Sequence, residues 1–396
     1  MVPRTEYPRV HITSSPIYLD HAATTPVRPE VAEAMSASLA EDFGNPSSGH
    51  AWGRRARRRL ETARASVAAS MGVAPERVFF TRGGTESDNL AVLGRLRHDL
   101  AEGVTPHVVT SAVEHPAVLE AAERGVLEGG RHTVIGFREG AFDLDALEQV
   151  LRDDRPGLVS CMWVNNETGL VLPIAEVGAL CRRYGVPLHS DAVQAVGKLP
   201  VDWARAPADL LTITGHKIYG PKGTGALIAR DFHALRPLHF GGGQERGLRP
   251  GTEDVAGASG LAEAVRLAVA EAPAESARLG SLRDEVEAGL LAGIPGARVN
   301  AGTVQRAAHI LSLGIPGADS DTLLAALDAS GIAVSGGSAC ASGSSAPSGT
   351  LAALYPGDTA AALRLSFGRL NRRRDAATVV RAVAEAVERT LALVSP

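Results

Sequence analysis

The sequence predicts an α/β fold in which a mostly parallel sheet is covered by helices on both faces. From about residue 77 to residue 190, short apolar runs alternate with amphipathic stretches of helical length. This alternation is typical of consecutive strand–helix units, whose crossover helices bury both faces of the sheet. From about Leu261 the chain changes to long Ala/Leu/Glu-rich helices followed by alternating strands such as 309–315. The change indicates a second, smaller domain that begins near Ala272.

The individual elements follow from the same patterns. Two helices are expected between Pro26 and Ala68, on either side of the loop EDFGNPSSGH. The next elements are expected to be strand 77–81, a helix from Glu86, strand 107–112, helix 115–125, strand 157–164, helix 174–185 and strand 186–191. Residues 209–229 are expected to form two strands joined by a Gly-rich turn, and 376–394 a last helix.

Composition excludes several classes of protein. The 396 residues carry a net charge of −4, which gives no indication of a nucleic-acid or acidic-membrane partner. The three cysteines lie far apart without a CxxC pair, so a disulfide framework, a zinc ribbon or another metal site is not expected. Such cysteine usage fits the reducing cytoplasm. Residues 1–16 lack the apolar core of a signal peptide, and no uncharged apolar run is long enough to span a bilayer.

One dense basic run stands out in this balanced composition. It consists of Arg54, Arg55, Arg57, Arg58 and Arg59. We interpret it as a solvated helix face, and a local contact with an anion or a partner is the alternative.

A lysine and a carboxylate follow two of the expected strands. Lys217 comes after an apolar strand, beside His216, where partial desolvation lowers an amine pKa and makes a candidate Schiff-base lysine; an ordinary surface lysine is the alternative. Asp191 ends strand 186–191, where α/β sheets place functional groups. It could keep the ring nitrogen of a pyridine-aldehyde cofactor protonated, with Gln194 on the ring hydroxyl, or it could be only a helix N-cap.

A glycine pair lies between strand 77–81 and the helix that follows. Gly83 and Gly84 allow the backbone to approach an anion, and the first N–H groups of a helix can then hold a phosphate, with Thr85 adding its hydroxyl. The alternative is a plain capped helix, because Thr85 and Asp88 fit the [ST]-x-x-[DE] capping box. Both can hold together, and the motif is neither a Walker A loop nor a GxGxxG fingerprint.

Two further strand ends carry polar side chains. His115 follows strand 107–112, and its flat imidazole could stack on a cofactor ring and move a proton, or simply cap the next helix. Asn165 and Asn166 close the Val-rich strand 157–164, where amide groups can reach a ligand or only form a turn.

These motifs, taken in order, resemble those of the class V aminotransferase superfamily and, within it, the cysteine desulfurases of the nitrogen-fixation and iron–sulfur-cluster assembly type. The resemblance extends from YLDHAATTPV to LRLSFGRLN and includes TESDNLA, EHPAVL, VNNETG, SDAVQAVGK, TGHKIYGPKGTGAL, GGGQERGLRPGT and GSACASGS. It implies the pyridoxal 5'-phosphate (PLP)-dependent transferase fold of type I. The large domain, residues 28–271, would contain a mostly parallel seven-stranded sheet, and residues 1–27 and 272–396 would form a smaller α+β domain.

The resemblance also implies the cofactor PLP, the substrate L-cysteine and a homodimer. Lys217 would form the Schiff base, His115 would stack on the ring, and Arg364 would pair with the substrate carboxylate through its guanidinium fork. Asn165 would face both cofactor and substrate. The other cofactor contacts would be made by Asp191, Gln194, Gly84, Thr85, Thr214, His216 and, from the partner subunit, Thr252.

The remaining implied residue is the nucleophile Cys340, in the Ser/Gly/Ala-rich stretch 335–349. It would attack the sulfur of the substrate, release alanine and pass the persulfide sulfur to a protein acceptor or scaffold. Small residues favour an accessible loop and a polar environment favours the thiolate, whereas an inert loop cysteine is the alternative. Cys161 and Cys181 are expected in the core, because one is in a strand and the other on an apolar helix face.

Some features depart from the family pattern. Thr214 stands where the family more often has serine, Gly349 stands where a large residue is usual, and the chain ends soon after its last helix. The sulfur acceptor is therefore not predicted. The competing hypotheses are another PLP lyase, such as a selenocysteine lyase or a β-lyase, and a non-catalytic protein that kept the fold.

Overall fold

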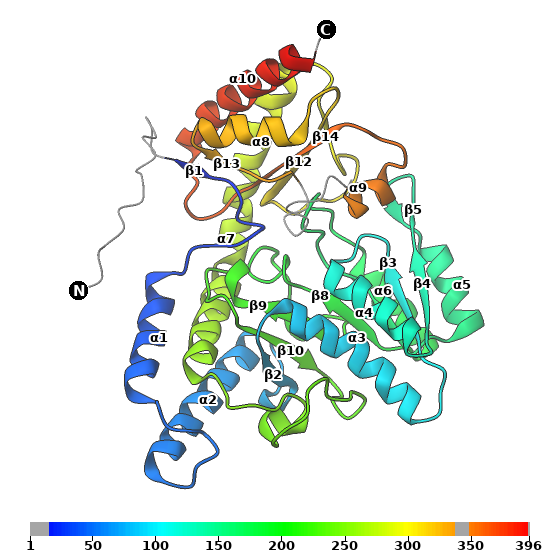
Figure 1. Cartoon of the computed structure of the whole chain (residues 1–396), viewed down its shortest axis with the longest axis vertical. Coiled ribbons are helices and arrows are strands. Elements are labelled where there is room, and N and C mark those ends of the chain that lie inside the picture. Colours follow the sequence, from blue (N-terminus) through cyan, green and yellow to red (C-terminus); the bar gives the residue numbers. More distant parts are fainter. Residues whose placement is uncertain (1–15, 337–347, 395–396) are drawn as a thin grey trace.

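A seven-stranded sheet forms the centre of the larger part of the molecule. The computed structural model describes residues 16–336 and 348–394, and the strand order is β2-β10-β9-β8-β7-β3-β4 (Figure 1). The strand β10 is antiparallel to both its neighbours, and the other pairs are parallel. The bounds are β2 (Val78–Thr81), β3 (His107–Ser111), β4 (Arg131–Ile135), β7 (Leu158–Ser160), β8 (Leu188–Asp191), β9 (Leu210–Thr214) and β10 (Gly225–Ala229).

Helices cover both faces of this sheet. Apolar side chains of α3 (Gly84–Ala101) and α4 (Pro116–Leu127) pack on one face. The other face is covered by α2 (Ala51–Ser70), α5 (Leu144–Asp154), α6 (Ile174–Tyr184) and the first part of α7 (Val255–Gly293), with α1 (Pro29–Glu41) outside them. Proline at the first position of α4 and Gly185 in a left-handed conformation after α6 fix two of the helix ends.

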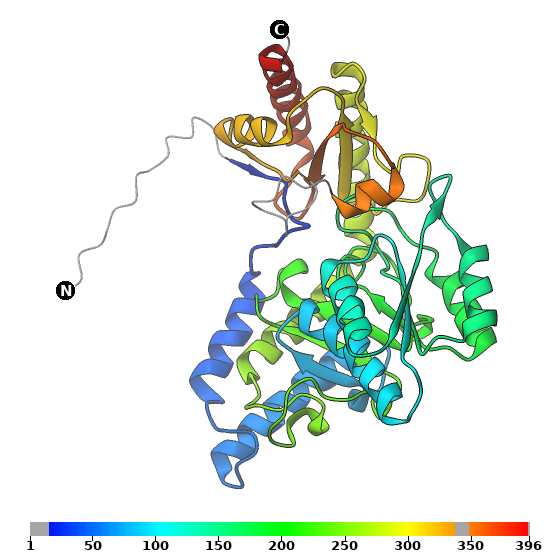
Figure 2. The same ribbon diagram turned by 45° about the vertical axis from the view of Figure 1, so that its right-hand side comes forward.

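The helix α7 joins the large core to a second, smaller one (Figure 2). Its buried residues up to Ala268 belong to the first core and those from Leu279 to the second. The second core contains the antiparallel strands β11 (Arg298–Val299), β12 (Ile310–Ile315) and β14 (Ala361–Ser366), with α8 (Ser320–Ala329) and α10 (Ala376–Val394). The short elements are β1 (Ile17–Tyr18) paired with β13 (Ile332–Ala333), β5 (Phe137–Arg138) paired with β6 (Ala141–Phe142), and α9 (Gly349–Leu354).

Most of the expected elements are confirmed, including the last helix, 376–394. The edge strand β4 and the helix α5 were not expected from the sequence. The strand β4 begins with the polar pair Arg131–His132, which does not fit the apolar run of a buried strand. The capping box at Thr85 and Asp88 is wrong: α3 starts at Gly84, Gly83 is its N-cap without a side-chain cap, and Asp88 is buried. The domain boundary near residue 272 stays a prediction, which the division of α7 between the two cores supports.

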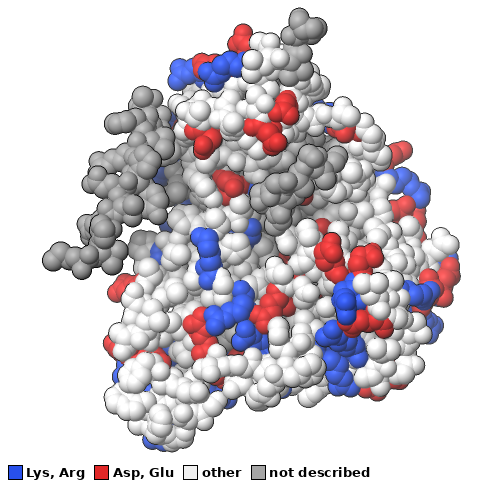
Figure 3. All heavy atoms as spheres, in the orientation of Figure 1, with Lys and Arg blue, Asp and Glu red and all other residues white. Residues whose placement is uncertain are grey.

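Charges on the surface are mixed in sign. Acidic and basic side chains are interspersed on the face shown in Figure 3. In the basic run on α2, Arg55 and Arg59 hold the two oxygens of Asp42, at 2.9 and 2.8 Å, while Arg54 and Arg58 are exposed. The run therefore combines a solvated face with an internal contact to the end of α1. Across the described residues, no helix combines the length and apolar character that crossing a membrane requires.

A buried ion pair attaches the loop after β10 to the sheet. Both guanidinium nitrogens Nη1 and Nη2 of Arg64 donate to the carboxylate of Glu245, at 2.8 and 2.7 Å, and both side chains are buried. The same carboxylate accepts from the backbone N–H of Phe80 on β2. Glu245 has φ of 45°, a left-handed conformation that costs free energy in a non-glycine residue, so the ion pair is what holds the loop in this shape.

We expect Arg64→Met to lower the free energy of unfolding by about 3–5 kcal/mol, because it leaves the carboxylate of Glu245 buried without its partner. Urea unfolding monitored by circular dichroism measures this change. The matched control is Arg57→Met on the same helix, whose side chain is 55% exposed and whose pair with Glu61 is at the surface. It should change stability by less than about 0.5 kcal/mol. Equal losses in the two variants would contradict the assignment.

Candidate active site

The polar side chains singled out in the sequence converge at the carboxyl edge of the sheet. Parallel strands end at the same edge, so the segments that follow β2, β3, β7, β8 and β9 meet there. These segments carry Gly84 and Thr85, His115, Asn165, Asp191 and the run Thr214–Lys217. The second core adds Arg364 from β14. The edge is therefore built from both parts of the molecule.

The glycine turn after β2 packs against the ends of two neighbouring strands. Gly83 has φ of 143°, which glycine adopts without strain. A Cβ atom on Gly84 would lie 3.1 Å from Val193 and 3.9 Å from Thr214, so this position is tight for any larger residue. The turn places the first N–H groups of α3 beside Thr214, whose hydroxyl donates to the carbonyl oxygen of Thr224 at 3.0 Å. This arrangement suits an anion such as a phosphate.

The amine of Lys217 lies against the backbone of the segment 20–25. Its Nζ donates to the carbonyl oxygens of Ala22 at 2.6 Å and Ala23 at 2.5 Å. The amide nitrogen of Gln194 donates to the same Ala22 oxygen at 2.8 Å. Beside them, burial lowers the pKa of His216 to about 4, and the charge of Lys217 adds to this shift. The lysine, the glutamine and the histidine are thus brought together as the sequence predicts.

Asp191 lies buried at the end of β8. Its Oδ1 accepts from the N–H of Val193 at 2.9 Å, but turns rather than a helix follow, so the helix N-cap alternative is wrong. Burial raises the pKa of Asp191, and its electrostatic interactions with His115, Lys217 and Lys198 oppose that rise. These electrostatic interactions show that the carboxylate, the imidazole and the amine share one site.

His115 is both an N-cap and a member of this site. Its Nδ1 accepts from the N–H of Ala117 at 3.0 Å, as the capping alternative predicts. This bond fixes the neutral tautomer with its proton on Nε2. The ring is therefore held in one orientation by the helix that it caps.

Asn165 has a different position from the one that the resemblance implies. Its Oδ1 accepts from the N–H groups of Glu167 and Thr168 and from the Thr168 hydroxyl, at 2.8–3.0 Å. Its Nδ2 lies 3.0 Å from the carbonyl oxygen of Val113 and 3.2 Å from the hydroxyl of Thr350. Both amide hydrogens thus have protein acceptors, which disagrees with a role facing cofactor and substrate. Asn165 instead connects two loops.

Arg364 is buried beside Asn166, the residue that follows Asn165. Its Nη1 donates to the backbone oxygen of Asn166 at 2.9 Å, and its Nη2 donates to Asp20 at 2.8 Å. The Asp20 side chain is 21% exposed, against 1% for Arg364. The guanidinium is therefore fixed by one backbone group and one partly solvated carboxylate, a geometry that can also present it to a substrate carboxylate.

Cys340 lies outside the described residues, but the residues that flank its segment, up to 336 and from 348, are described. The backbone of Ser335 pairs with that of Arg364. On the other side, the hydroxyl of Ser348 donates to Glu167, and Thr350 contacts Asn165. The segment that contains Cys340 thus starts and ends beside the site.

The other two cysteines are buried, which confirms the expectation for them. Burial raises the pKa of the Cys181 thiol to about 12, and it raises that of Cys161 well above the usual value. Neither thiol has the exposure or the ionisation that a nucleophile needs.

Two buried acids at this edge, Glu114 and Asp88, were not predicted as site residues from the sequence. Glu114 accepts from the hydroxyl of Ser111 and, at 2.7 Å, from the N–H of Met162, and burial raises its pKa to about 8. Burial, together with the charge of Asp191, raises the pKa of Asp88 well above its usual value. Asp88 lies in the motif TESDNLA and Glu114 in EHPAVL. The sequence alone does not indicate that the side chain of a charged residue beside a functional one is buried.

The segment Asp20–Thr25 was also quoted only as part of a motif. It contacts four of the site residues: Asp20 bonds Arg364, Ala22 bonds Gln194 and Lys217, and Thr24 lies 3.2 Å from the imidazole of His216. Two of these four contacts use the backbone carbonyl of Ala22, which sequence patterns do not reveal.

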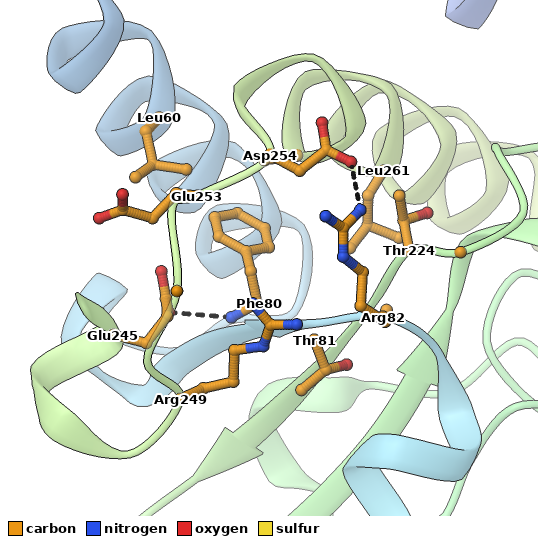
Figure 4. Close-up of a pocket in the computed structure, with 14 residues that line it drawn as sticks. Leu60, Phe80, Thr81, Arg82, Thr224, Glu245, Arg249, Glu253, Asp254 and Leu261 are labelled. Carbon is orange, nitrogen blue, oxygen red and sulfur yellow. Dashed lines mark hydrogen bonds and ion pairs between the residues drawn. The ribbon is translucent and has the colours of Figure 1, made fainter. Parts of the chain in front are cut away.

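A small pocket lies between the β2 turn and the loop after Glu245 (Figure 4). Arg82 points across it to Asp254 at 2.8 Å, and Arg249 bonds Glu86 at 3.0 Å. Gly251 and Glu253 line the pocket, and Thr252 between them is exposed. In the parts of the chain that the structure describes, no group of three or more His, Cys, Asp or Glu residues is arranged to hold a metal ion.

We expect stability to fall between pH 5 and pH 8 because of Glu114. Its pKa is raised from 4.5 to about 8 in the folded state, so the native protein binds more protons than the unfolded chain in this range, and unfolding becomes easier as pH rises. Glu114→Gln, which keeps the accepting oxygen, should reduce the fall by on the order of 3 kcal/mol.

Urea unfolding at four pH values measures this effect. The exposed Glu120 on α4 provides the control Glu120→Gln, which should keep the wild-type pH dependence. An unchanged slope in Glu114→Gln would show that another buried acid causes the fall.

Comparisons with known proteins agree with this geometry. A family model described as "Aminotransferase class-V" matches residues 17–379. The "IscS-like cysteine desulfurase" of Mycobacterium tuberculosis is 44% identical over 381 residues, covering 94% of this chain and 96% of that protein. A solved "NIFS-LIKE PROTEIN" has a TM-score of 0.86 at 31% identity, covering 94% of this chain and 99% of its own. "SspA in complex with cysteine" has a TM-score of 0.75 at 31% identity, covering 89% and 98%. The chain therefore belongs to the class-V aminotransferase family and, within it, to the cysteine desulfurases of the IscS and NifS type.

Proposed function

We propose that the protein is a PLP-dependent cysteine desulfurase that converts L-cysteine to L-alanine and leaves a persulfide on Cys340. The observation that carries this proposal is the convergence of Lys217, Asp191 and Arg364, which come from three strands, at one edge of the sheet. An amine, a buried carboxylate and a guanidinium are the groups that hold an aldehyde cofactor, its ring nitrogen and an amino-acid carboxylate.

The residues present fit PLP. The buried Asp191 offers a carboxylate for the ring nitrogen, and Gln194 offers an amide N–H for the ring oxygen. The turn at Gly84 and Thr85 offers N–H groups and a hydroxyl to a phosphate, and His216 lies beside it. The hydroxyl of Thr214, which donates to Thr224, would turn to the phosphate. When bound, PLP supplies an electron sink for bond breaking at the amino acid's carbons.

The protein's own groups would orient the substrate and move its protons. Arg364 would bind the α-carboxylate through the guanidinium that pairs with the partly solvated Asp20. Lys217, held by the Ala22 and Ala23 carbonyls, would give and take the proton at the substrate's α-carbon. His115 would move a proton at Nε2, because the bond at Nδ1 fixes that tautomer. Asn166, whose backbone oxygen accepts from Arg364, would take the place of Asn165 as the asparagine beside the substrate carboxylate.

Cys340 would be the nucleophile. It is five residues from Ser335, which pairs with Arg364, and five residues span at most about 18 Å, so the thiol is within reach of the site. The thiolate attacks the substrate sulfur: a sulfur–sulfur bond forms, the carbon–sulfur bond breaks, and its electron pair stays with the carbon. Protonation of that carbon gives alanine, and the terminal sulfur then passes to a protein acceptor.

The complete site would require a second copy of the chain. The exposed Thr252 fits the role of a phosphate contact given to the partner subunit in a homodimer. The three cysteines lie far apart, and such usage fits a compartment that keeps thiols reduced, so we place the enzyme in the cytoplasm.

We expect purified protein with PLP and L-cysteine to release alanine and to gain one sulfur atom on Cys340, whereas Cys340→Ala should do neither. Amino-acid analysis and intact-protein mass spectrometry measure the two products. The buried Cys181 gives the matched control Cys181→Ala, which should retain the activity. Pyruvate and ammonia as products, or equal turnover in Cys340→Ala, would favour a β-lyase instead.

We expect Arg364→Lys to lower kcat/KM for L-cysteine by about 10–100-fold, mainly through KM, because an ammonium cannot reproduce two parallel bonds to a carboxylate. Steady-state kinetics with alanine detection measure the loss. Arg369→Lys is the control, since this partly exposed arginine pairs with Glu271. A similar loss in both variants would remove Arg364 from the substrate site.

A further inference from the structure

The carboxamide of Gln194 is held from both sides by groups that fix its orientation. Its oxygen lies 2.5 Å from Nζ of Lys198 and 3.2 Å from Nε2 of His309. Its nitrogen lies 2.8 Å from the carbonyl oxygen of Ala22. A carbonyl can only accept, and a lysine amine carries hydrogens in either protonation state. A flipped amide would set two oxygens against each other, so the assignment of its oxygen and nitrogen follows from the partners.

His309 reaches this amide from the second core. It immediately precedes β12 and is 1% exposed. Since the amide oxygen can only accept, His309 donates from Nε2 and its Nδ1 carries no proton in the neutral ring. Burial lowers the pKa of His309 well below its usual value, which keeps the ring neutral.

Lys198 is the second lysine of the site and is partly buried. The chain contains three lysines, Lys198, Lys217 and Lys222, and the first two lie on opposite sides of Gln194 and Ala22. Burial lowers the pKa of Lys198 well below its usual value, and the charges of Lys217 and Arg364 add to the shift. Withdrawing an amine from water is costly unless it keeps a hydrogen-bond partner, and Gln194 supplies one.

We infer that Lys198 and His309 are positioning residues that fix the Gln194 carboxamide with its N–H groups, rather than its oxygen, toward the side of Lys217. The inference rests on the proposed function, in which Gln194 donates to the ring oxygen of PLP on that side. The amide nitrogen carries two hydrogens and Ala22 takes one, which leaves the second for the ring oxygen. An amide free to turn would present its oxygen for part of the time and repel the ring oxygen.

A charge effect of Lys198 makes a different prediction. If Lys198 acted only through its charge on the cofactor, its removal would have the same effect with or without Gln194. If it acts through the amide, its effect disappears once Gln194 is replaced. A double-mutant cycle separates the two.

The test is a pH titration of the visible absorption band of the holoenzyme in wild type, Lys198→Met, Gln194→Leu and the double variant. Each single variant should raise the midpoint by about one to two pH units, about 10–100-fold in proton affinity, through loss of one hydrogen bond to a charged oxygen. The double variant should titrate like Gln194→Leu alone. His309→Leu should give a smaller shift, since its bond is longer.

Two further variants control this experiment. Lys198→Gln keeps an N–H donor without the charge and should restore most of the wild-type midpoint. Lys222→Met removes an exposed lysine two residues after Gly220 and should leave the midpoint unchanged. A Lys198→Met shift that persists in the Gln194→Leu background overturns the inference.

A cofactor-free measurement separates this inference from the proposed function. In the protein stripped of PLP, Lys198→Met and Gln194→Leu should be coupled by about fivefold in the unfolding equilibrium constant, because their hydrogen bond does not need the cofactor. A wild type without a visible band on adding PLP would refute the proposed function. Absence of coupling in the stripped protein would refute the positioning role by itself.

Discussion

The carbonyl oxygen of Ala22 is the point on which the site depends. It accepts from Lys217 after β9 and from Gln194 after β8, while the N–H of Ala22 donates to Ser366 on β14. The backbone of one residue therefore connects two strands of the large sheet with the smaller core. A shift of this segment would leave a buried ammonium or amide without an acceptor, at a cost of about 1–3 kcal/mol for each group.

Buried charge is the second constraint at this edge. Asp191, Asp88 and Glu114 are three carboxyl groups in an environment with little water, and burial raises the pKa of each. Asp191 differs from the other two because its interactions with His115, Lys217 and Lys198 oppose the rise in its pKa. The site thus keeps its negative charge where a ring nitrogen would need it and favours protons on the neighbouring acids.

The strands and the strand-end residues could be predicted from the sequence, because an apolar run and the polar residues that follow it are local signals. Lys217, Asp191 and Gly84 lie where these signals placed them. The contacts that organise them were not predictable, since the Ala22 carbonyl belongs to a residue without a functional side chain. The orientation of Asn165 was not predictable either, because five hydrogen bonds from distant and neighbouring residues decide it.

The helix α7 belongs to both cores and contains Pro273, between the last residue buried in the first core and the first buried in the second. Proline has no N–H, so the carbonyl of Val269 lacks its partner in the helical ladder at this point. If α7 unwinds from its end in the second core, the unwinding reaches the missing hydrogen bond at Pro273 before it reaches the part of the helix that packs on the large sheet. Amide hydrogen exchange along this one helix should therefore fall into two levels of protection, and β14, which carries Arg364, shares the level of the less protected half.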